Sequence, residues 1–341
     1  MVKLLNPKNL EEVEKWETFN RKKGYLWHSA KWISVLHKTY GFKPFYLYEE
    51  ENGEIISIFP LFHVKGLLGL KDEFVSVPHV ETGGVINSDR FSNYLDFLSS
   101  NREIKKLRIY QFKDKINSYP SNDINSIFFI DIPKTQDELI KFFKKKKKRS
   151  LRKIENKDFP VNWGFSQENL EKFFYLLRKR MKELGTPWHK KEFYINTFLT
   201  FRENLLFLLM EQNNTPVGVS IAVIYGKVCY SLYHLVPRKY QRYGISLSLY
   251  YYLMKKARSE GAEVFCFGRS KKGTGPYELK KSFGAVEYPI HIYSFRKKNN
   301  SFIPEYSEFV SQKYGWISDI IRKLPINVLE PIAGSIRKWV Y

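Results

Sequence analysis

The sequence is poor in cysteine, in acidic residues and in long apolar runs, and the shortages of cysteine and apolar runs exclude whole classes of protein. Its 341 residues include two cysteines, Cys229 and Cys266, too few for a disulfide framework, so we expect buried thiols in a reducing compartment. No stretch approaches the roughly 18 apolar residues that cross a bilayer. The first residues lack the apolar segment of a signal peptide. We therefore expect a cytoplasmic protein that either is free or lies at the inner face of the membrane.

Positive charge is what the chain has in excess. It contains 57 Lys+Arg against 35 Asp+Glu, a formal charge of +22. This charge points to an anionic partner, with nucleic acid, a phosphorylated metabolite and acidic lipid all open, or to solvation and ion pairing alone. Aromatic residues make up 17% of the chain, enough to exclude disorder as its main state. No cluster of His, Cys and Asp has the spacing of metal ligands, so we predict no metal.

Apolar periodicity predicts a mixed α/β domain over residues 1–135. We expect a helix capped by Asn6 with Pro7 in its first turn, and a second helix from Ser29 to Gly41. A hairpin should turn at Asn52-Gly53. Further strands are expected at residues 74–77, 107–112 and 127–132, with a helix at 91–99.

A second α/β domain is predicted over residues 136–298. It opens with a basic helix at 141–157, where nine of the thirteen residues from Lys141 to Lys153 are basic. Helix, helix, three antiparallel strands, helix, strand, helix, strand then follow, which is the order of a GNAT-type N-acyltransferase fold. The fold class is therefore α/β (α+β), with two tandem GNAT-like domains containing mixed sheets.

Residues 299–341 are expected to form a C-terminal helical tail. The apolar and basic pattern predicts two short amphipathic helices separated at Pro325 and Pro331. They either pack on the domain body or lie on an anionic membrane. The oligomeric state is left open.

The stretch from Phe267 to Gly284 contains the most specific motif. We expect a strand to end at Phe267, and a glycine-rich loop to lead into a helix from Pro276. Glycines and a helix N-terminus favour an anion, although a surface turn with solvated lysines is the alternative. Helical spacing places Tyr277, Lys280 and Lys281 on one face, with Leu279 and Phe283 turned to the core.

Two weaker signals lie upstream. The first signal is the start of a helix at Gln241, Gly244 and Ser246. These residues fit a loop that holds the pyrophosphate of coenzyme A, and the alternative is an ordinary helix N-terminus with a basic turn. His234, on a strand with Tyr230 and Tyr233, is a candidate base or a core histidine. Because strand side chains alternate, we expect one of the two tyrosines at most to reach a substrate.

The motif Phe-Gly-Arg-Ser-x-x-Gly-x-Gly-x-Tyr-x-x-Lys-Lys-x-x-Gly resembles the signature of FemAB-related proteins. Further stretches over roughly residues 25–340 also resemble this family: Trp27-His-Ser-x-x-Trp32, Tyr40-Gly41, Phe59-Pro-Leu61, the basic run 147–153 and Arg180-x-x-x-Leu-Gly-Thr-Pro187. The resemblance implies two tandem GNAT-like domains, the first completed by a C-terminal segment. Fem-type ligases transfer an amino acid from aminoacyl-tRNA onto a peptidoglycan precursor, whereas a wider group is acetyltransferase-like and associated with exopolysaccharide.

The resemblance also implies residue roles. Lys280 matches a lysine that stabilises the oxyanion and the tRNA terminus, although Leu279 replaces the usual aromatic. Fem-type ligases often have an acidic residue at the end of a strand in the first domain, where this chain reads Leu107-Arg-Ile-Tyr-Gln111. We list the candidate sets as catalytic Lys280, Tyr277 and His234; substrate-binding Arg269, Arg180, Tyr233 and Lys281; and donor-binding Gln241, Gly244 and Ser246.

The leading hypothesis is acyl or aminoacyl transfer to an amine of a peptidoglycan or polysaccharide precursor. No cofactor is expected to be resident, and the donor is either aminoacyl-tRNA or acetyl-CoA or another acyl-CoA. Candidate partners are an anionic envelope precursor or nucleotide-sugar, tRNA, and an anionic membrane contacted by the tail. The alternatives are an acetyl-CoA-dependent N-acetyltransferase of another small substrate, and a basic nucleic-acid- or membrane-binding protein without catalysis.

Overall fold

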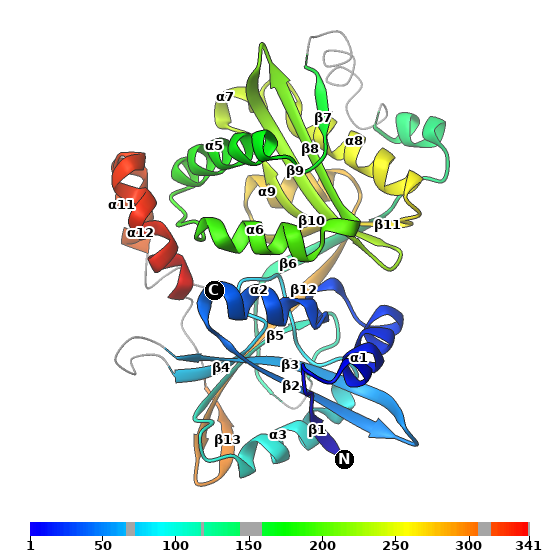
Figure 1. Cartoon of the computed structure of the whole chain (residues 1–341), viewed down its shortest axis with the longest axis vertical. Coiled ribbons are helices and arrows are strands. Elements are labelled where there is room, and N and C mark those ends of the chain that lie inside the picture. The colour runs from blue at the N-terminus through cyan, green and yellow to red at the C-terminus, as the bar shows by residue number, and fades with distance from the viewer. Residues whose placement is uncertain (66–71, 117–118, 144–158, 306–314, 340–341) are drawn as a thin grey trace.

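A computed structural model describes residues 1–65, 72–116, 119–143, 159–305 and 315–339 (Figure 1). Its N-terminal half contains, in chain order, β1 (Val2–Leu4), α1 (Leu10–Lys23), α2 (Lys31–Tyr40), β2 (Lys43–Glu51), β3 (Glu54–Lys65), β4 (Asp72–Ser76), α3 (Phe91–Ser100), β5 (Lys106–Phe112) and β6 (Asn122–Asp131). The predicted hairpin is confirmed, with Asn52 and Gly53 both at positive φ in its turn. The predicted helix start at Asn6 is wrong, because the Asn9 side chain accepts the Glu11 and Glu12 amides and caps α1 instead.

The C-terminal half is a second α/β unit. It contains β7 (Val161–Trp163), α5 (Gln167–Leu184), α6 (Lys191–Thr200), β8 (Leu205–Gln212), β9 (Thr215–Tyr225), β10 (Val228–Leu235), α7 (Arg238–Gln241), α8 (Ile245–Ser259), β11 (Val264–Lys271), α9 (Gly275–Ser282) and β12 (Val286–Lys298). Residues 136–143 are helical, whereas the rest of the basic helix expected at 141–157 lies outside the described residues. The sequence prediction missed α6.

One mixed sheet joins the two halves. Its strand order is β1-β2-β3-β4-β5-β12-β6-β11-β10-β9-β8-β7, and β13 (Ser301–Pro304) pairs with β12. The long strand β12 lies between β5 and β6, so a segment from late in the chain completes the sheet of the first half. This agrees with the arrangement that the family resemblance implies.

The largest core cluster is shared by the two halves. Helices α2 and α6 lie side by side at the centre of Figure 1, where Asn196 donates to Thr39 at 3.1 Å and the Trp32 and Phe201 rings are 5.1 Å apart. In the second half, α5 and α6 cover one face of the strands, and α8 and α9 cover the other. Shared packing of this kind holds the halves in a fixed relation.

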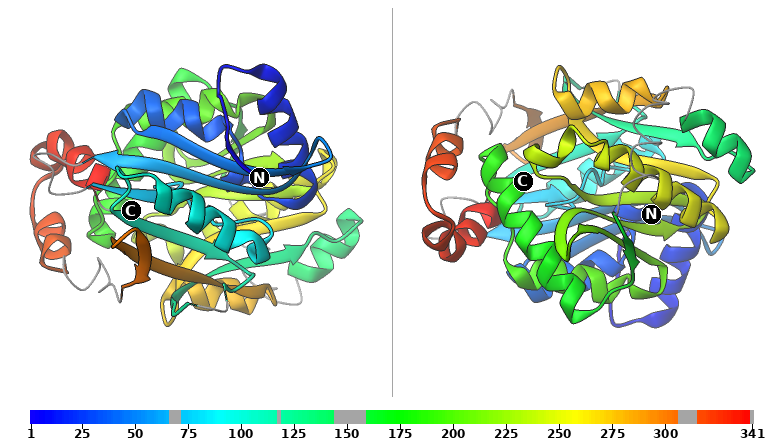
Figure 2. Two further views of the ribbon diagram at one scale, coloured as in Figure 1. Left: turned by 90° about the horizontal axis from the view of Figure 1, so that it is seen from below. Right: turned by 90° about the horizontal axis from the view of Figure 1, so that it is seen from above.

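The C-terminal tail forms α11 (Gly315–Lys323) and α12 (Ile326–Trp339), which lie along one side of the body (Figure 2). The helices separate at Pro325 as expected, but Pro331 lies inside α12. No helix among the described residues is long and apolar enough to cross a membrane.

Candidate active site

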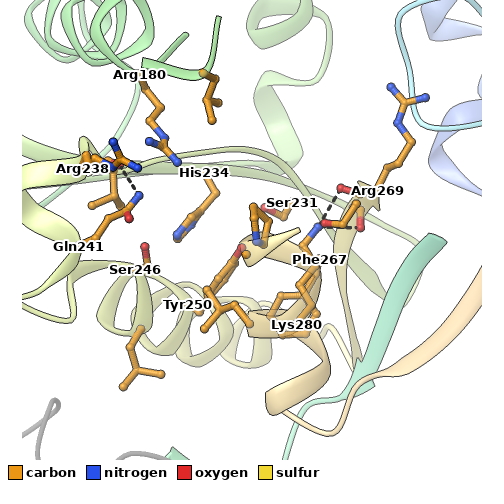
Figure 3. Close-up of a pocket in the computed structure, with 18 of the residues that line it drawn as sticks. Arg180, Ser231, His234, Arg238, Gln241, Ser246, Tyr250, Phe267, Arg269 and Lys280 are labelled. Atoms are coloured by element: carbon orange, nitrogen blue, oxygen red, sulfur yellow. Dashed lines mark hydrogen bonds between the residues drawn. The ribbon is translucent and has the colours of Figure 1, made fainter. Parts of the chain in front are cut away.

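A cavity of about 740 Å³ opens where two parallel strands separate (Figure 3). Strands β10 and β11 pair only as far as Tyr230 and Cys266, although they continue to Leu235 and Lys271. Residues of both diverging strands line the cavity, together with residues of α5, α7, α8 and α9 and with Glu81 from the first half. The main-chain groups of parallel strands that have parted are available to a ligand.

Bulges in both strands set the directions of the side chains. In β10 the register shifts between Ser231 and Tyr233, so Tyr230 and Tyr233 both pack into the shared core, while Ser231 and His234 line the cavity. The expectation that the two tyrosines point to opposite faces is therefore wrong, since a bulge adds one residue and interrupts the alternation. Tyr233 lies among Phe173, Tyr194 and Phe198 and is not part of the cavity lining.

Lys280 lies at the floor of the cavity. Its side chain is 6% exposed, and its Nζ donates to the carbonyl oxygens of Gly268 at 2.9 Å and Arg269 at 3.0 Å. Burial lowers the pKa of Lys280 from 10.5 to about 8, and Glu81 partly opposes this effect. Phe283 and Leu279 pack with the core as predicted. Lys280 lines the cavity beside Leu279 whereas Lys281 is exposed, so the prediction that the two lysines share a face is wrong.

Gly268 allows close packing beside Lys280. It has a φ of +72°, and a Cβ there would lie 3.2 Å from the Ser231 carbonyl oxygen and 3.4 Å from a Glu81 carboxylate oxygen. Strand β11 therefore continues through a bulge at Gly268 to Lys271, so the predicted strand end at Phe267 is wrong. A residue with no side chain suits both this backbone conformation and this approach.

Glu81 is a site residue that the sequence analysis missed. Its Oε2 lies 3.3 Å from Arg269 Nε, which forms an ion pair between the two halves of the chain. Gln111, at the end of β5, holds the loop that carries Glu81: its amide accepts from the Val85 amide at 2.7 Å and donates to the Val85 carbonyl at 2.9 Å. An acid from the first half is thus present, although not at the strand end where the resemblance implied one.

The loop that contains Glu81 has one feature that could have been recognised in the sequence. Gly83 and Gly84 follow Glu81 within two and three positions, and a Cβ at either would collide with Val77 or Gln111. Adjacent glycines after an acidic residue indicate a tight turn of the backbone. These glycines do not indicate which part of the protein the loop packs against.

His234 forms the cavity wall with Tyr250. The two rings are stacked 4.0 Å apart with an angle of 3° between their planes. His234 Nδ1 lies 3.3 Å from Ser220 Oγ, and its Nε2 has no hydrogen-bond partner among the described residues. Burial, reinforced by Lys280 and Arg180, lowers the pKa of His234 to about 3. The imidazole is therefore neutral at pH 7 and a weak base.

The N-terminus of α8 forms the other end of the cavity. Gly244 caps the helix at a φ of +78°, with no side chain bonded to the first-turn amides. Gln241, Gly244 and Ser246, the three predicted donor-binding residues, all line the cavity here, and Arg238 and Arg242 lie beside them. Free helix amides with nearby cations form a favourable place for an anion.

Arg180 also lines this end of the cavity. Its guanidinium donates to Glu183 at 2.9 Å, and Glu183 also accepts the main-chain amide of Arg238 at 2.9 Å. The predicted substrate-binding arginine therefore reaches the cavity, and Glu183, with which it pairs, joins α5 to the start of α7.

Other predicted residues lie elsewhere. Tyr277 donates to Glu287 at 2.8 Å and packs edge-on against Phe128, and neither Tyr277 nor Lys281 is part of the cavity lining. The two cysteines are fully buried, and burial raises both thiol pKa values. Over the described ranges, no three His, Cys, Asp or Glu side chains gather to hold a metal ion.

Comparisons with known proteins agree with the fold. Residues 141–281 match the family model described as an acetyltransferase (GNAT) domain. A crystal structure of FemX superposes with a TM-score of 0.64 at 12% identity, covering 85% of this chain and 96% of that one. The chain has the Fem-related tandem GNAT fold.

Two further structures share this fold. A tandem GNAT protein from the clavulanic acid biosynthesis pathway has a TM-score of 0.53 at 8% identity, covering 90% of this chain and 99% of that one. L-PGS from Bacillus licheniformis has a TM-score of 0.53 at 14% identity, covering 91% and 97%. No curated protein matches the sequence. The domain match and the shared fold support an enzyme of the acyltransferase class.

Proposed function

We propose that the protein is an N-acyltransferase that moves an acyl group from an acyl-CoA to an amine in the cavity where β10 and β11 separate. The observation that carries this proposal is the buried Lys280 ammonium, held at the cavity floor by two main-chain carbonyl oxygens. Its one remaining N–H is free to point at an oxygen on which negative charge develops. A fixed hydrogen-bond donor of this kind stabilises an acyl-transfer transition state by roughly 3 kcal/mol.

The two ends of the cavity suit the two ends of an acyl-CoA. The first-turn amides of α8, with Arg238 and Arg242 beside them, offer a place for the pyrophosphate. Between α8 and Lys280 the parted strands β10 and β11 present main-chain groups. An extended arm that contains amides, such as the pantetheine arm, pairs naturally with such groups.

Glu81 is placed to act on the acceptor. Its carboxylate, beside Gly268 and within 3.3 Å of Arg269, binds the incoming ammonium and takes one of its protons. The freed amine attacks the acyl carbon, Lys280 stabilises the oxyanion, and the carbon–sulfur bond breaks. Glu81 releases the first proton to water, then takes the second proton from the amine nitrogen and passes it to the thiolate, so that the products are an amide, a thiol and one proton in solution. His234, neutral at pH 7, offers a hydrogen bond rather than general-base catalysis.

The acceptor that we propose is an amine of an anionic cell-envelope precursor, as the Fem resemblance implies. Arg269, at the acceptor side, is a cation that an anionic group of such a precursor can share with Glu81. Either a peptidoglycan precursor or a nucleotide-sugar has this chemistry.

Aminoacyl-tRNA is a second candidate donor. The run of basic residues from Lys141 to Lys153 favours it, since such a run binds phosphates along a nucleic-acid backbone. Residues 144–153 of this run lie outside the described residues.

The deciding experiment offers acetyl-CoA and charged tRNA separately as donors, with a panel of envelope-precursor amines, and detects products by mass spectrometry. Lys280→Met should lower the rate with the productive donor by roughly 10²- to 10³-fold. Lys281→Met is the matched control, because Lys281 is adjacent but exposed and outside the cavity. Equal rates for the two variants would refute the role of Lys280, and transfer from charged tRNA alone would refute the acyl-CoA assignment.

A further inference from the structure

The C-terminal helices have apolar side chains on two faces. On α11, Trp316 and Ile320 are 61% and 42% exposed, and on α12, Val328 and Ile332 are 45% and 42% exposed. Each pair is spaced i, i+4, so its members lie on one side of their helix. We call these four residues the tail ridge. The body leaves both apolar pairs largely uncovered.

The inner faces of the same helices account for their packing on the body. Ile321, Leu329 and Ala333 are at most 2% exposed and belong to the shared core. The helices also approach the body closely: a Cβ at Gly185 would lie 2.6 Å from the Ser318 carbonyl oxygen, and one at Gly334 would lie 2.5 Å from Lys190 Cγ. Anchoring of the tail therefore does not require the tail ridge.

Charge around the tail ridge has a positive sign. The acidic residues of α11 and α12 are paired, Asp319 with Arg322 at 2.9 Å and Glu330 with Arg178 at 3.2 Å. Lys323 is exposed at the end of α11, and the chain as a whole carries +22. Tryptophan and branched aliphatic residues flanked by cations are the composition of helices that lie in an anionic bilayer surface.

The tail also lies beside the cavity. Arg322 donates to the Leu184 carbonyl oxygen at 3.2 Å, and Leu184 lines the cavity at the end of α5. Figure 2 shows α11 and α12 at the outer margin of the body in both views, next to α5. The tail therefore lies near this end of the cavity.

We propose that the tail ridge inserts into an anionic lipid surface and holds the cavity beside the bilayer. The docking itself is independent of the reaction. Its consequence rests on the proposed function, and it is that transfer takes place at the membrane surface, with the end of the cavity formed by α5 and the start of α8 nearest the bilayer.

The test is flotation of the full chain with vesicles of phosphatidylcholine alone and with about 30 mol% phosphatidylglycerol. We expect binding to the anionic vesicles, and roughly ten-fold or greater weakening in Trp316→Ser/Ile320→Ser/Val328→Ser/Ile332→Ser. The matched control is Leu10→Ser/Trp163→Ser/Leu199→Ser/Val286→Ser, which removes four apolar side chains, 82%, 40%, 50% and 55% exposed, from other surfaces. The control should bind as the wild type does.

Three results would overturn the proposal: no binding to anionic vesicles, equal loss in the two quadruple variants, or a wild-type dimer in solution that the tail-ridge variant alone dissolves. The last result would assign the ridge to a second copy of this chain. Transfer to a water-soluble amine separates this proposal from the proposed function. The tail-ridge variant should keep wild-type turnover there, whereas Lys280→Met should lose turnover and still float.

Discussion

Glu81 and Arg269 form an ion pair across the two halves of the molecule, with 3.3 Å between Glu81 Oε2 and Arg269 Nε. Glu81 comes from a loop that follows β4, and Arg269 from the bulged part of β11. Both side chains are about one quarter exposed, at 26% and 29%, so the pair faces the cavity. The site therefore exists only when both halves are folded against each other.

Glu81→Gln should lower the catalytic rate while leaving the stability of the fold nearly unchanged. If Glu81 takes the proton of the acceptor, we expect kcat to fall by roughly 10²-fold. The free energy of unfolding should change by less than about 1 kcal/mol, because the ion pair is partly solvated. Glu278→Gln, on the exposed side of α9, is the control. Steady-state kinetics and urea denaturation measure both effects, and an unchanged kcat would contradict the role of Glu81.

Lys280 should give activity and stability opposite dependences on pH. Its pKa is lowered from 10.5 to about 8, so the ammonium is lost as the pH rises through 8, and the rate should fall roughly ten-fold by pH 9. Between pH 8 and 10.5 the unfolded chain binds the proton that the folded protein has lost. Stability should therefore rise with pH in this window, by roughly 3 kcal/mol at most.

The control for this prediction is Lys280→Met, measured by denaturant unfolding at several pH values from 7 to 10. The difference between wild type and variant cancels the titration of other groups. A difference that does not change with pH would show that Lys280 keeps its ordinary pKa.

Gly268→Ala should damage the site as well as the fold. An alanine at the φ of +72° costs roughly 1–2 kcal/mol, and its methyl would lie 3.4 Å from Glu81 Oε1. Gly273→Ala has a similar φ of +75° but nothing within 4 Å, so it measures the backbone cost alone. Both variants should lose stability, Gly268→Ala more so because its methyl also lies 3.2 Å from the Ser231 carbonyl oxygen, and Gly268→Ala should also lose activity. Equal activities in the two variants would argue against close packing at Gly268.

The cations at the start of α8 should act on donor binding. We expect Arg238→Ala/Arg242→Ala to raise KM for the acyl-CoA roughly ten-fold, to leave kcat nearly unchanged, and to weaken the dependence of KM on salt. Lys239→Ala is the control, because Lys239 lies between these residues in the chain and outside the cavity lining. A similar rise in KM for the control would indicate general charge rather than a phosphate site.

Local features of the sequence determined much of the fold. The hairpin follows from Asn52-Gly53 and the end of α5 from Gly185, because these residues adopt positive φ at low cost. Apart from α6 and the four-residue helix α7, the order of helices and strands from β8 to β12 was also correctly predicted, since each element depends on neighbouring residues. The motif around Lys280 placed one lysine in the candidate site.

The tertiary structure decided which groups meet. Only packing turns Lys280 inward and leaves Lys281 exposed, because α9 is short and its orientation depends on the strands beneath it. The bulges that redirect Tyr233 and carry Gly268 depend on register with neighbouring strands, which no local pattern records. Glu81 lies far from Lys280 in the chain and reaches the cavity because Gln111 holds its loop and because the halves share one core. Chemistry that depends on such long-range contacts is set by the fold as a whole.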